Sequence, residues 1–144
     1  MTHEDAGNYA GKHPKGSEPD RRVAEVLEEL ARDGTISCAN AFKTAARLNR
    51  NPADVGMTID LLEYRISRCQ LGLFGYGSRR RIVEPAAQVR PEMKQAIEEA
   101  LEDGRISCAA CWEVARRLGC ARMDVASACE ALAVKISVCQ LGSF

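Results

Sequence analysis

Histidine and aromatic residues are scarce in this sequence. Only two of its 144 residues are histidines, His3 and His13, and aromatic residues make up 5%. Ser-His-Asp and Cys-His catalytic systems and histidine-bound metals therefore have little to be built from. The phosphate-binding motif G-x-x-x-x-G-K-S/T and the metalloprotease motif H-E-x-x-H are also absent from the chain. We therefore expect a protein that is not an enzyme.

Long apolar runs are missing as well. None approaches the roughly 20 residues that a transmembrane helix needs, and the polar first 20 residues contain no apolar core of a signal peptide. An odd number of cysteines, seven, would leave one unpaired in a complete set of disulfides. We expect a cytoplasmic protein with reduced thiols and no contact with a membrane.

Neither sign of charge is in excess over the whole chain. The 20 basic and 20 acidic residues give a net charge of zero, which excludes the globally basic composition typical of many nucleic-acid-binding proteins. Between Arg21 and Arg81, however, basic residues outnumber acidic ones by 11 to 7. Any contact with nucleic acid would therefore come from this local excess.

The chain contains an internal duplication. The segment D-G-T-I-S-C at 33–38 returns as D-G-R-I-S-C at 103–108, and C-Q-L-G-L-F at 69–74 returns as C-Q-L-G-S-F at 139–144. Both pairs are separated by the same 70 residues, so no net insertion divides them. A constant separation over this length predicts two copies of one unit. Because each copy is near the lower size limit for independent folding, we expect the copies to pack together.

Each copy shows the same succession of helical and extended patterns. In the first copy we expect a helix at 23–31, a short strand at 35–37, helices at 38–48 and 52–63, and a strand within 64–72. Ser37 is a candidate N-cap for the second of these helices. Asn51 followed by Pro52 is the typical start of the third.

This order predicts a mainly α fold with short β hairpins, organised as two tandem winged-helix-like repeats. We expect a flexible N-terminal arm at residues 1–20, a first repeat at 21–83, a linker at 84–90 and a second repeat at 91–144 with an incomplete wing. The wing of the first repeat would be Gly72–Ser78, followed by a returning strand at Arg79–Val83. A helical bundle with short hairpins is the alternative.

The succession from D-G-T-I-S-C-A through A-A-R-L at 45–48 to L-L-E at 61–63 resembles the winged-helix superfamily of small prokaryotic regulators. The repeated C-Q-L-G-x-F ending is similar to that of a small prokaryotic family of tandem proteins, from which no activity can be transferred. The resemblance covers residues 21–144. It implies DNA binding and transcription regulation as expectations only, because a fold does not dictate a function.

The expected third helix is a poor candidate for reading DNA. A winged helix that binds DNA places this helix in the major groove, yet residues 52–63 carry three acidic side chains and no Lys or Arg. Its expected solvent face holds Ala53, Gly56, Met57 and Asp60. Contact with duplex DNA is therefore predicted through phosphates or the minor groove, at Arg47, Arg50, Arg65, Arg68, Arg79, Arg80 and Arg81. A protein partner, bound by an accessory module that does not bind DNA, is the alternative.

Four cysteines occur at equivalent positions of both copies: Cys38, Cys69, Cys108 and Cys139. Buried structural thiols and no cofactor are the interpretation we favour. The alternative is a four-thiolate site for zinc or another thiolate-bound metal, formed if the copies meet face to face. Cys108 and Cys111 also have the C-x-x-C spacing of a redox pair.

Overall fold

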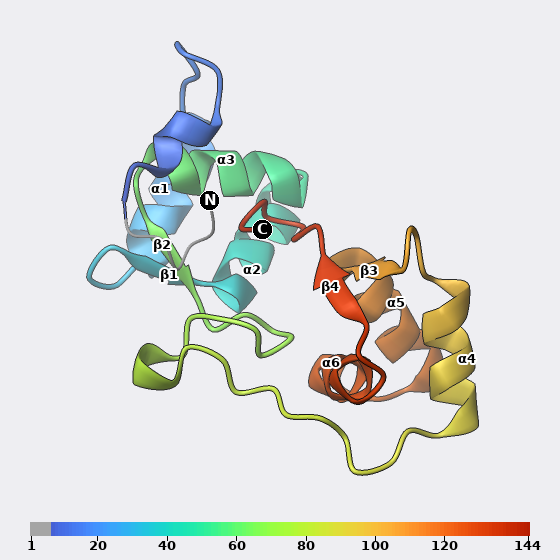
Figure 1. The fold of residues 1–144 in the computed structure, drawn as a ribbon. Coiled ribbons are helices and arrows are strands. Elements are labelled where there is room, and N and C mark those ends of the chain that lie inside the picture. The colour runs from blue at the N-terminus through green and yellow to red at the C-terminus, as the bar shows by residue number, and fades with distance from the viewer. Residues whose placement is uncertain (1–6) are drawn as a thin grey trace.

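Each repeat folds into three helices and two short strands. The computed structural model describes residues 7–144 (Figure 1). The first repeat contains α1 (Arg21–Leu30), β1 (Thr35–Ser37), α2 (Cys38–Leu48), α3 (Pro52–Leu61) and β2 (Arg65–Ser67); the second contains α4 (Pro91–Glu99), β3 (Arg105–Ser107), α5 (Cys108–Leu118), α6 (Arg122–Ala131) and β4 (Lys135–Ser137). Two short 3₁₀ helices lie at Tyr9–Lys12 and Gly77–Arg79. The predicted mainly α fold with short β elements is confirmed. Residues 1–6 of the expected arm, with His3, lie outside the described residues.

The short strands pair in parallel within each repeat rather than as hairpins. β1 pairs with β2, and β3 pairs with β4 in the equivalent register. The returning strand predicted at Arg79–Val83 does not form. Instead, the N–H groups of Ile82 and Val83 both donate to the carbonyl of Gly72, and the Val83 side chain is buried in the core. The expected wing is therefore an irregular loop, because these bonds close it onto itself.

Side-chain caps mark the start of α1, α2 and α5. The Asp20 carboxylate accepts hydrogen bonds from the N–H groups of Arg22 and Val23 at the start of α1. The Ser37 hydroxyl accepts the N–H of Asn40 at 3.1 Å, which confirms the cap predicted for α2. The equivalent serine, Ser107, caps α5 in the same way. These caps satisfy backbone N–H groups that the first turn of a helix leaves without partners.

A tight turn after α1 brings β1 into place. Asp33 and Gly34 both adopt positive φ values, 52° and 72°. The residues on either side of this pair, Arg32 and Thr35, exchange two backbone hydrogen bonds of 2.9 Å. An Asp-Gly pair suits this left-handed geometry, and the equivalent pair at 103–104 repeats it. The turn directs β1 towards β2.

The two C-Q-L-G-x-F segments form closely similar loops, which we call the first exchange loop (69–74) and the second exchange loop (139–144). In each loop the glycine N–H donates to the carbonyl of the starting cysteine, at 2.9 Å for Gly72 and 3.0 Å for Gly142. The cysteine N–H in turn donates to the carbonyl of the closing phenylalanine. Both glycines have positive φ, 75° and 82°, which glycine adopts without steric cost.

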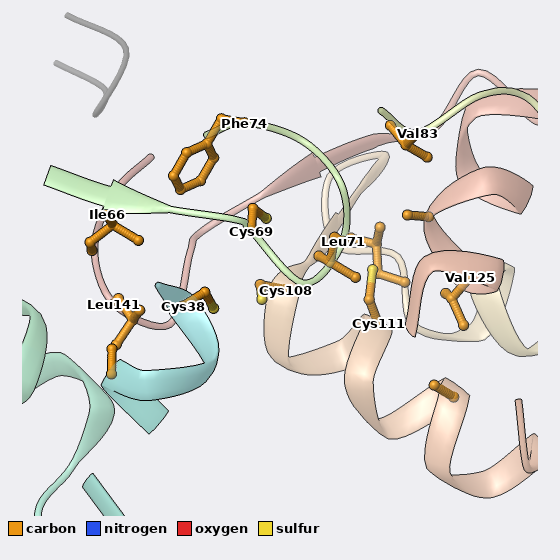
Figure 2. Close-up of a cluster of buried hydrophobic side chains, with 14 of the residues drawn as sticks. Cys38, Ile66, Cys69, Leu71, Phe74, Val83, Cys108, Cys111, Val125 and Leu141 are labelled. Atoms are coloured by element: carbon orange, nitrogen blue, oxygen red, sulfur yellow. The ribbon is translucent and has the colours of Figure 1, made fainter. Parts of the chain in front are cut away.

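Each exchange loop packs against the opposite repeat. Figure 1 shows the C-terminal segment reaching across to α2 and α3, where the backbone of Leu141 lies against Gly56. In the other direction, Gly72 lies against Met123 of α6. Figure 2 shows Leu71 among the buried side chains of the second repeat. Each loop therefore completes the core of the other repeat, so the two units share one hydrophobic core.

The segment that precedes each repeat lies across its third helix. Within residues 7–20, the Lys12 Nζ and His13 Nε2 atoms lie 3.0 and 2.8 Å from the carboxylate of Asp60 on α3. Before the second repeat, Arg81 pairs with Glu130 of α6, the residue equivalent to Asp60. The described part of the expected flexible arm thus makes specific contacts with α3, one of them through the imidazole of His13.

Candidate functional site

The two repeats meet around a pseudo-two-fold axis at which equivalent residues touch each other. Phe42 and Trp112, which are 70 residues apart in the chain, have ring centroids 4.3 Å apart. Phe74 and Phe144, related by the same separation, meet edge to face at 6.1 Å. Contact between equivalent positions is the geometry of an isologous two-fold interface. The axis therefore brings together matching side chains from both repeats.

The four cysteines that both repeats contain gather at this axis. Cys38 and Cys108 are the first residues of α2 and α5, and Cys69 and Cys139 begin the exchange loops. Each helix cysteine interacts electrostatically with both loop cysteines. Figure 2 shows Cys38, Cys69 and Cys108 around the junction of α2, α5 and the first exchange loop. Three of the thiols are buried, and Cys139 is half-buried.

Side-chain amides point at the two helix cysteines. The Nε2 atom of Gln70 lies 3.6 Å from the Sγ of Cys38, and the Nε2 atom of Gln140 lies 3.4 Å from the Sγ of Cys108. Both glutamines belong to the repeated C-Q-L-G motif, so the duplication could have identified them although the sequence prediction did not include them. An amide nitrogen only donates, so each sulfur is the acceptor.

Backbone N–H groups form hydrogen bonds with the sulfur atoms of the two loop cysteines. The N–H of Leu141 donates to the Sγ of Cys139 at 3.4 Å. Burial raises the pKa of the Cys69 thiol, while the backbone N–H groups of Leu73 and Leu71 oppose this rise in its pKa. All four repeated thiols therefore have N–H donors directed at sulfur.

Arg122 of α6 links the repeats beside these thiols. Its guanidinium lies 3.5 Å from the centroid of the Trp112 ring, and it donates to the Oε1 atom of Gln70. Because a guanidinium has only donors, this bond turns the amide oxygen towards Arg122 and leaves the amide nitrogen for Cys38. The equivalent residue in the first repeat is Pro52, so the duplication gave no signal for Arg122.

Burial favours the protonated form of the helix thiols. It raises the pKa of Cys38 to about 12 and that of Cys108 to about 11, against the opposing effect of the glutamine amides. Among residues 7–144, no group of three or more Cys, His, Asp and Glu side chains is arranged to hold a metal ion. The four thiols predicted as metal ligands are thus neighbours, but they do not converge on one point as ligands of a single zinc ion do.

The two other buried thiols form a separate pair. Cys111 of α5, predicted as the redox partner of Cys108, is hydrogen-bonded to Cys129 of α6; this bond and burial raise the pKa of Cys111. Their equivalents in the first repeat are the apolar residues Ala41 and Ile59. All seven cysteines are free thiols. Cys111 and Cys129 therefore fill apolar core positions, and redox activity of Cys108 with Cys111 stays a prediction.

Four of the seven predicted DNA-binding arginines are engaged in ion pairs. Two of these pairs have a structural role. The Asp20 carboxylate, which pairs with Arg50, also caps α1, and the Glu130 carboxylate, which pairs with Arg81, lies on α6. The other two pairs each join two exposed side chains, and such pairs contribute little to stability. The pairs are Arg47–Glu29 at 3.8 Å, Arg50–Asp20 at 2.9 Å, Arg79–Glu84 at 3.7 Å and Arg81–Glu130.

Four of the seven arginines, the paired Arg79 among them, are exposed around a glycine-rich loop. Arg65 lines a surface hollow together with Gly75 and Gly77. The N–H groups of Arg68 and Arg80 donate to the carbonyls of the same two glycines, at 3.1 and 3.2 Å. Arg79 has one exposed carboxylate at 3.7 Å, and the other three have no ion-pair partner among residues 7–144. We call this set, Arg65, Arg68, Arg79 and Arg80, the arginine cluster.

The third helix of the first repeat, α3, presents only part of the surface that the sequence predicts. Gly56 and Asp60, expected on the solvent face of α3, are both buried. Gly56 is covered by the second exchange loop, and Asp60 is 1% exposed beneath the segment before α1. On α6 the equivalent of Gly56, Ala126, is fully buried too. The expectation is confirmed for Ala53, which is exposed, and Met57 is half-buried. It is wrong for Gly56 and Asp60, because the segments that cover them are distant in sequence.

Comparisons of the chain with models of protein families, with curated proteins and with solved structures find no match. None of the helices within residues 7–144 combines the length and the apolar character needed to cross a lipid bilayer.

Proposed function

We propose that this protein is a non-catalytic regulator that binds duplex DNA by gripping phosphates with the arginine cluster. One observation carries the proposal: four arginine side chains are exposed around one loop, and three of them have no ion-pair partner in the described chain. Arginine without a carboxylate partner is well suited to a phosphate, which it binds through parallel N–H donors. The resemblance to winged-helix regulators supports duplex DNA as the source of that phosphate.

The mode of binding follows from the covered third helices. Because Gly56 and Asp60 are buried, these two positions of α3 are not available for contacts with base edges in a major groove. Phosphate contacts set the position of a protein on DNA but carry little sequence information. We therefore expect binding that depends strongly on salt and only weakly on DNA sequence.

The test is a titration of labelled duplex DNA, followed by fluorescence anisotropy, at two salt concentrations. With about four phosphate contacts, affinity falls about 100-fold between roughly 50 and 200 mM salt. A variant with Ala at all four positions of the arginine cluster is expected to lose this binding at low salt. The matched control replaces four exposed arginines elsewhere, Arg21, Arg22, Arg116 and Arg117, and removes the same charge.

Two results would overturn the proposal. One is the absence of binding by the wild-type protein at low salt, where phosphate contacts are strongest. The other is an equal loss of binding in the cluster variant and in the matched control, which would indicate nonspecific attraction by overall charge. The alternative function, a protein-interaction module, is favoured by the covered third helices and would then take precedence.

A further inference from the structure

A surface hollow of about 280 Å³ lies where the strands of the first repeat meet the glycine-rich loop. We call it the glycine hollow, and it is lined by Thr35, Arg65, Ser67, Gly75 and Gly77. Thr35 and Ser67 carry hydroxyl groups and Arg65 carries a guanidinium, while no carboxylate of residues 7–144 belongs to the lining. Such a lining suits an oxyanion, whose oxygens accept hydrogen bonds from all of these groups.

The pairing of β1 with β2 brings these donors together. Thr35 and Arg65 are register partners, and Ser67 follows Arg65 by two residues. Side chains two residues apart in a strand share one face of the sheet, and the intervening residues, Ile36 and Ile66, are buried in the core. The donors therefore lie on the outer face. The Ser67 hydroxyl has no hydrogen-bond partner within residues 7–144, so it is available to a ligand.

The two glycines shape the hollow. A Cβ atom on Gly75 would lie 2.6 Å from the N atom of Arg68 and 2.7 Å from the Cα atom of Ser67, so only glycine lets the loop approach β2 this closely. A Cβ atom on Gly77 would meet nothing within 4 Å, so the hollow is open on that side. The loop is thus fixed against the strand at one glycine and leaves space for a ligand at the other.

The same loop holds an arginine in a strained backbone conformation. Arg80 has a φ of 59° and a ψ of −60°, and across it the N–H of Arg81 donates to the carbonyl of Arg79 at 2.6 Å. This is a γ-turn with positive φ, which is rare and strained, and strained backbone is concentrated at functional sites. The N–H of Arg80 donates to the carbonyl of Gly77. The charge of Arg80 is therefore held at the border of the hollow, without an ion-pair partner in the described chain.

The second repeat has a hollow at the equivalent strand pair, but its chemistry differs. Its lining consists of Glu102, Asp103, Arg105, Ser107, Ser137 and Val138. Two carboxylates and one guanidinium give this lining an excess of negative charge, and it contains no glycine. The duplication thus supplies an internal comparison, in which only the hollow of the first repeat suits an anion.

We infer that the glycine hollow binds a phosphate monoester. At pH 7 a monoester carries a charge of about −1.5 to −2 and three acceptor oxygens, whereas each phosphate within a DNA strand carries about one negative charge. Two hydroxyl groups and the charges of Arg65 and Arg80 match the monoester. Duplex DNA as the source of this group, through its 5′-terminal phosphate, rests on the proposed function. A free nucleotide carries the same group and is the other source.

The test compares a short duplex with 5′-phosphate ends and the same duplex with 5′-hydroxyl ends, each titrated with the full-length protein and followed by fluorescence anisotropy. The phosphorylated duplex is expected to bind about 10-fold more tightly, which is the contribution of one hydrogen bond to a charged group. Ser67→Ala removes a hydroxyl donor and is expected to lose most of this preference. The matched control, Ser137→Ala at the equivalent position of the second hollow, is expected to keep it.

A measurement on the wild-type protein does not depend on how the variants fold. Inorganic phosphate is titrated into the protein, and the backbone amide resonances are followed by NMR. Those of Ser67, Gly75 and Gly77 are expected to shift and to saturate, whereas those of Ser137 and Val138 in the second hollow stay in place. A nucleoside 5′-monophosphate is tested in the same way. Tighter binding of this nucleotide than of the phosphorylated duplex would support the hollow with a free nucleotide as its ligand.

The outcomes separate this inference from the proposed function, which is judged by binding of the unphosphorylated duplex. If inorganic phosphate and the nucleotide cause no saturable shift in the glycine hollow, the inference is wrong, whether or not DNA binds. Shifts at Ser137 as large as those at Ser67 would also overturn it, because they would indicate adsorption without a site. If neither duplex binds but phosphate shifts the hollow resonances, the proposed function fails and the phosphate site stands.

Discussion

Gly56 of α3 and Leu141 of the second exchange loop are in direct backbone contact. A Cβ atom placed on Gly56 would lie 1.9 Å from the Leu141 carbonyl oxygen and 2.7 Å from its carbonyl carbon. Contacts this short cannot be relieved by rotation of a side chain, because the neighbour is main chain. The loop exchange thus depends on the absence of a side chain at one position, 85 residues away in the chain.

The first prediction is that Gly56→Ala destabilises the protein. In an ordinary helix this change adds about 0.5–1 kcal/mol of stability. Here the clash reverses the sign, and we expect the free energy of unfolding to fall by about 3 kcal/mol, at the upper end of overpacking costs. Urea unfolding followed by circular dichroism measures the change. The control is Ala53→Gly at an exposed position of the same helix, expected to cost about 1 kcal/mol from helix propensity alone. A stabilised Gly56→Ala variant would contradict the loop exchange.

The second prediction concerns the pH dependence contributed by Asp20. The hydrogen bond from Arg50, followed by that from the Val23 N–H, lowers the pKa of the Asp20 carboxyl in the folded protein. Because the folded pKa is lowered, this stabilisation is present above about pH 4 and is lost as the pH falls through the folded value. Asp20→Asn keeps the helix cap and removes the charge. We expect wild type to be more stable than Asp20→Asn at neutral pH and equal to it in acid, as measured by urea unfolding at both. A difference that does not change with pH would contradict this assignment.

The third prediction is that Val138→Gly stabilises the protein. Val138 has a φ of 55° and a side chain that is 66% exposed. Left-handed backbone costs roughly 1–2 kcal/mol for a residue with a side chain, and little packing is lost when an exposed side chain is removed. We expect a gain of about 1 kcal/mol in the free energy of unfolding. Val138→Thr is the control, because threonine is also β-branched and keeps the strain while removing exposed apolar surface. An equal gain in both variants would locate the effect in surface hydrophobicity.

The sequence predicted the local structure well wherever one residue acts on its neighbours. The Ser37 cap and the Asn51-Pro52 start of the third helix needed only short-range rules. The parallel pairing of the strands was missed because three-residue strands carry no signal of their direction. The loop exchange was missed because C-Q-L-G-x-F is the same in both repeats, so either loop could satisfy either core.

In the candidate sites, too, the sequence indicates what repeats or lies nearby in the chain, and only the structure shows contacts between distant residues. The duplication alone singled out the four repeated thiols as one set, and the structure brings them together at the pseudo-two-fold axis. Arg122 has no equivalent arginine in the first repeat, so only the three-dimensional contact with Trp112 and Gln70 reveals its position. The covered face of α3 depends on Lys12, which is 48 residues away from Asp60 in the chain. Side-chain contacts over such separations leave no local pattern.

The fourth prediction is that Phe42 and Trp112 stabilise each other across the pseudo-two-fold axis. Their centroids are 4.3 Å apart and their planes are inclined at 46°, and aromatic pairs contribute about 0.5–1.5 kcal/mol beyond their buried area. A double-mutant cycle with Phe42→Leu and Trp112→Leu is expected to give a coupling energy in that range. The control cycle combines Phe42→Leu with Ile97→Val, a conservative change at a buried position of α4. That cycle should be additive within about 0.5 kcal/mol. Equal coupling in both cycles would show that the repeats unfold together without a specific contribution from this ring contact.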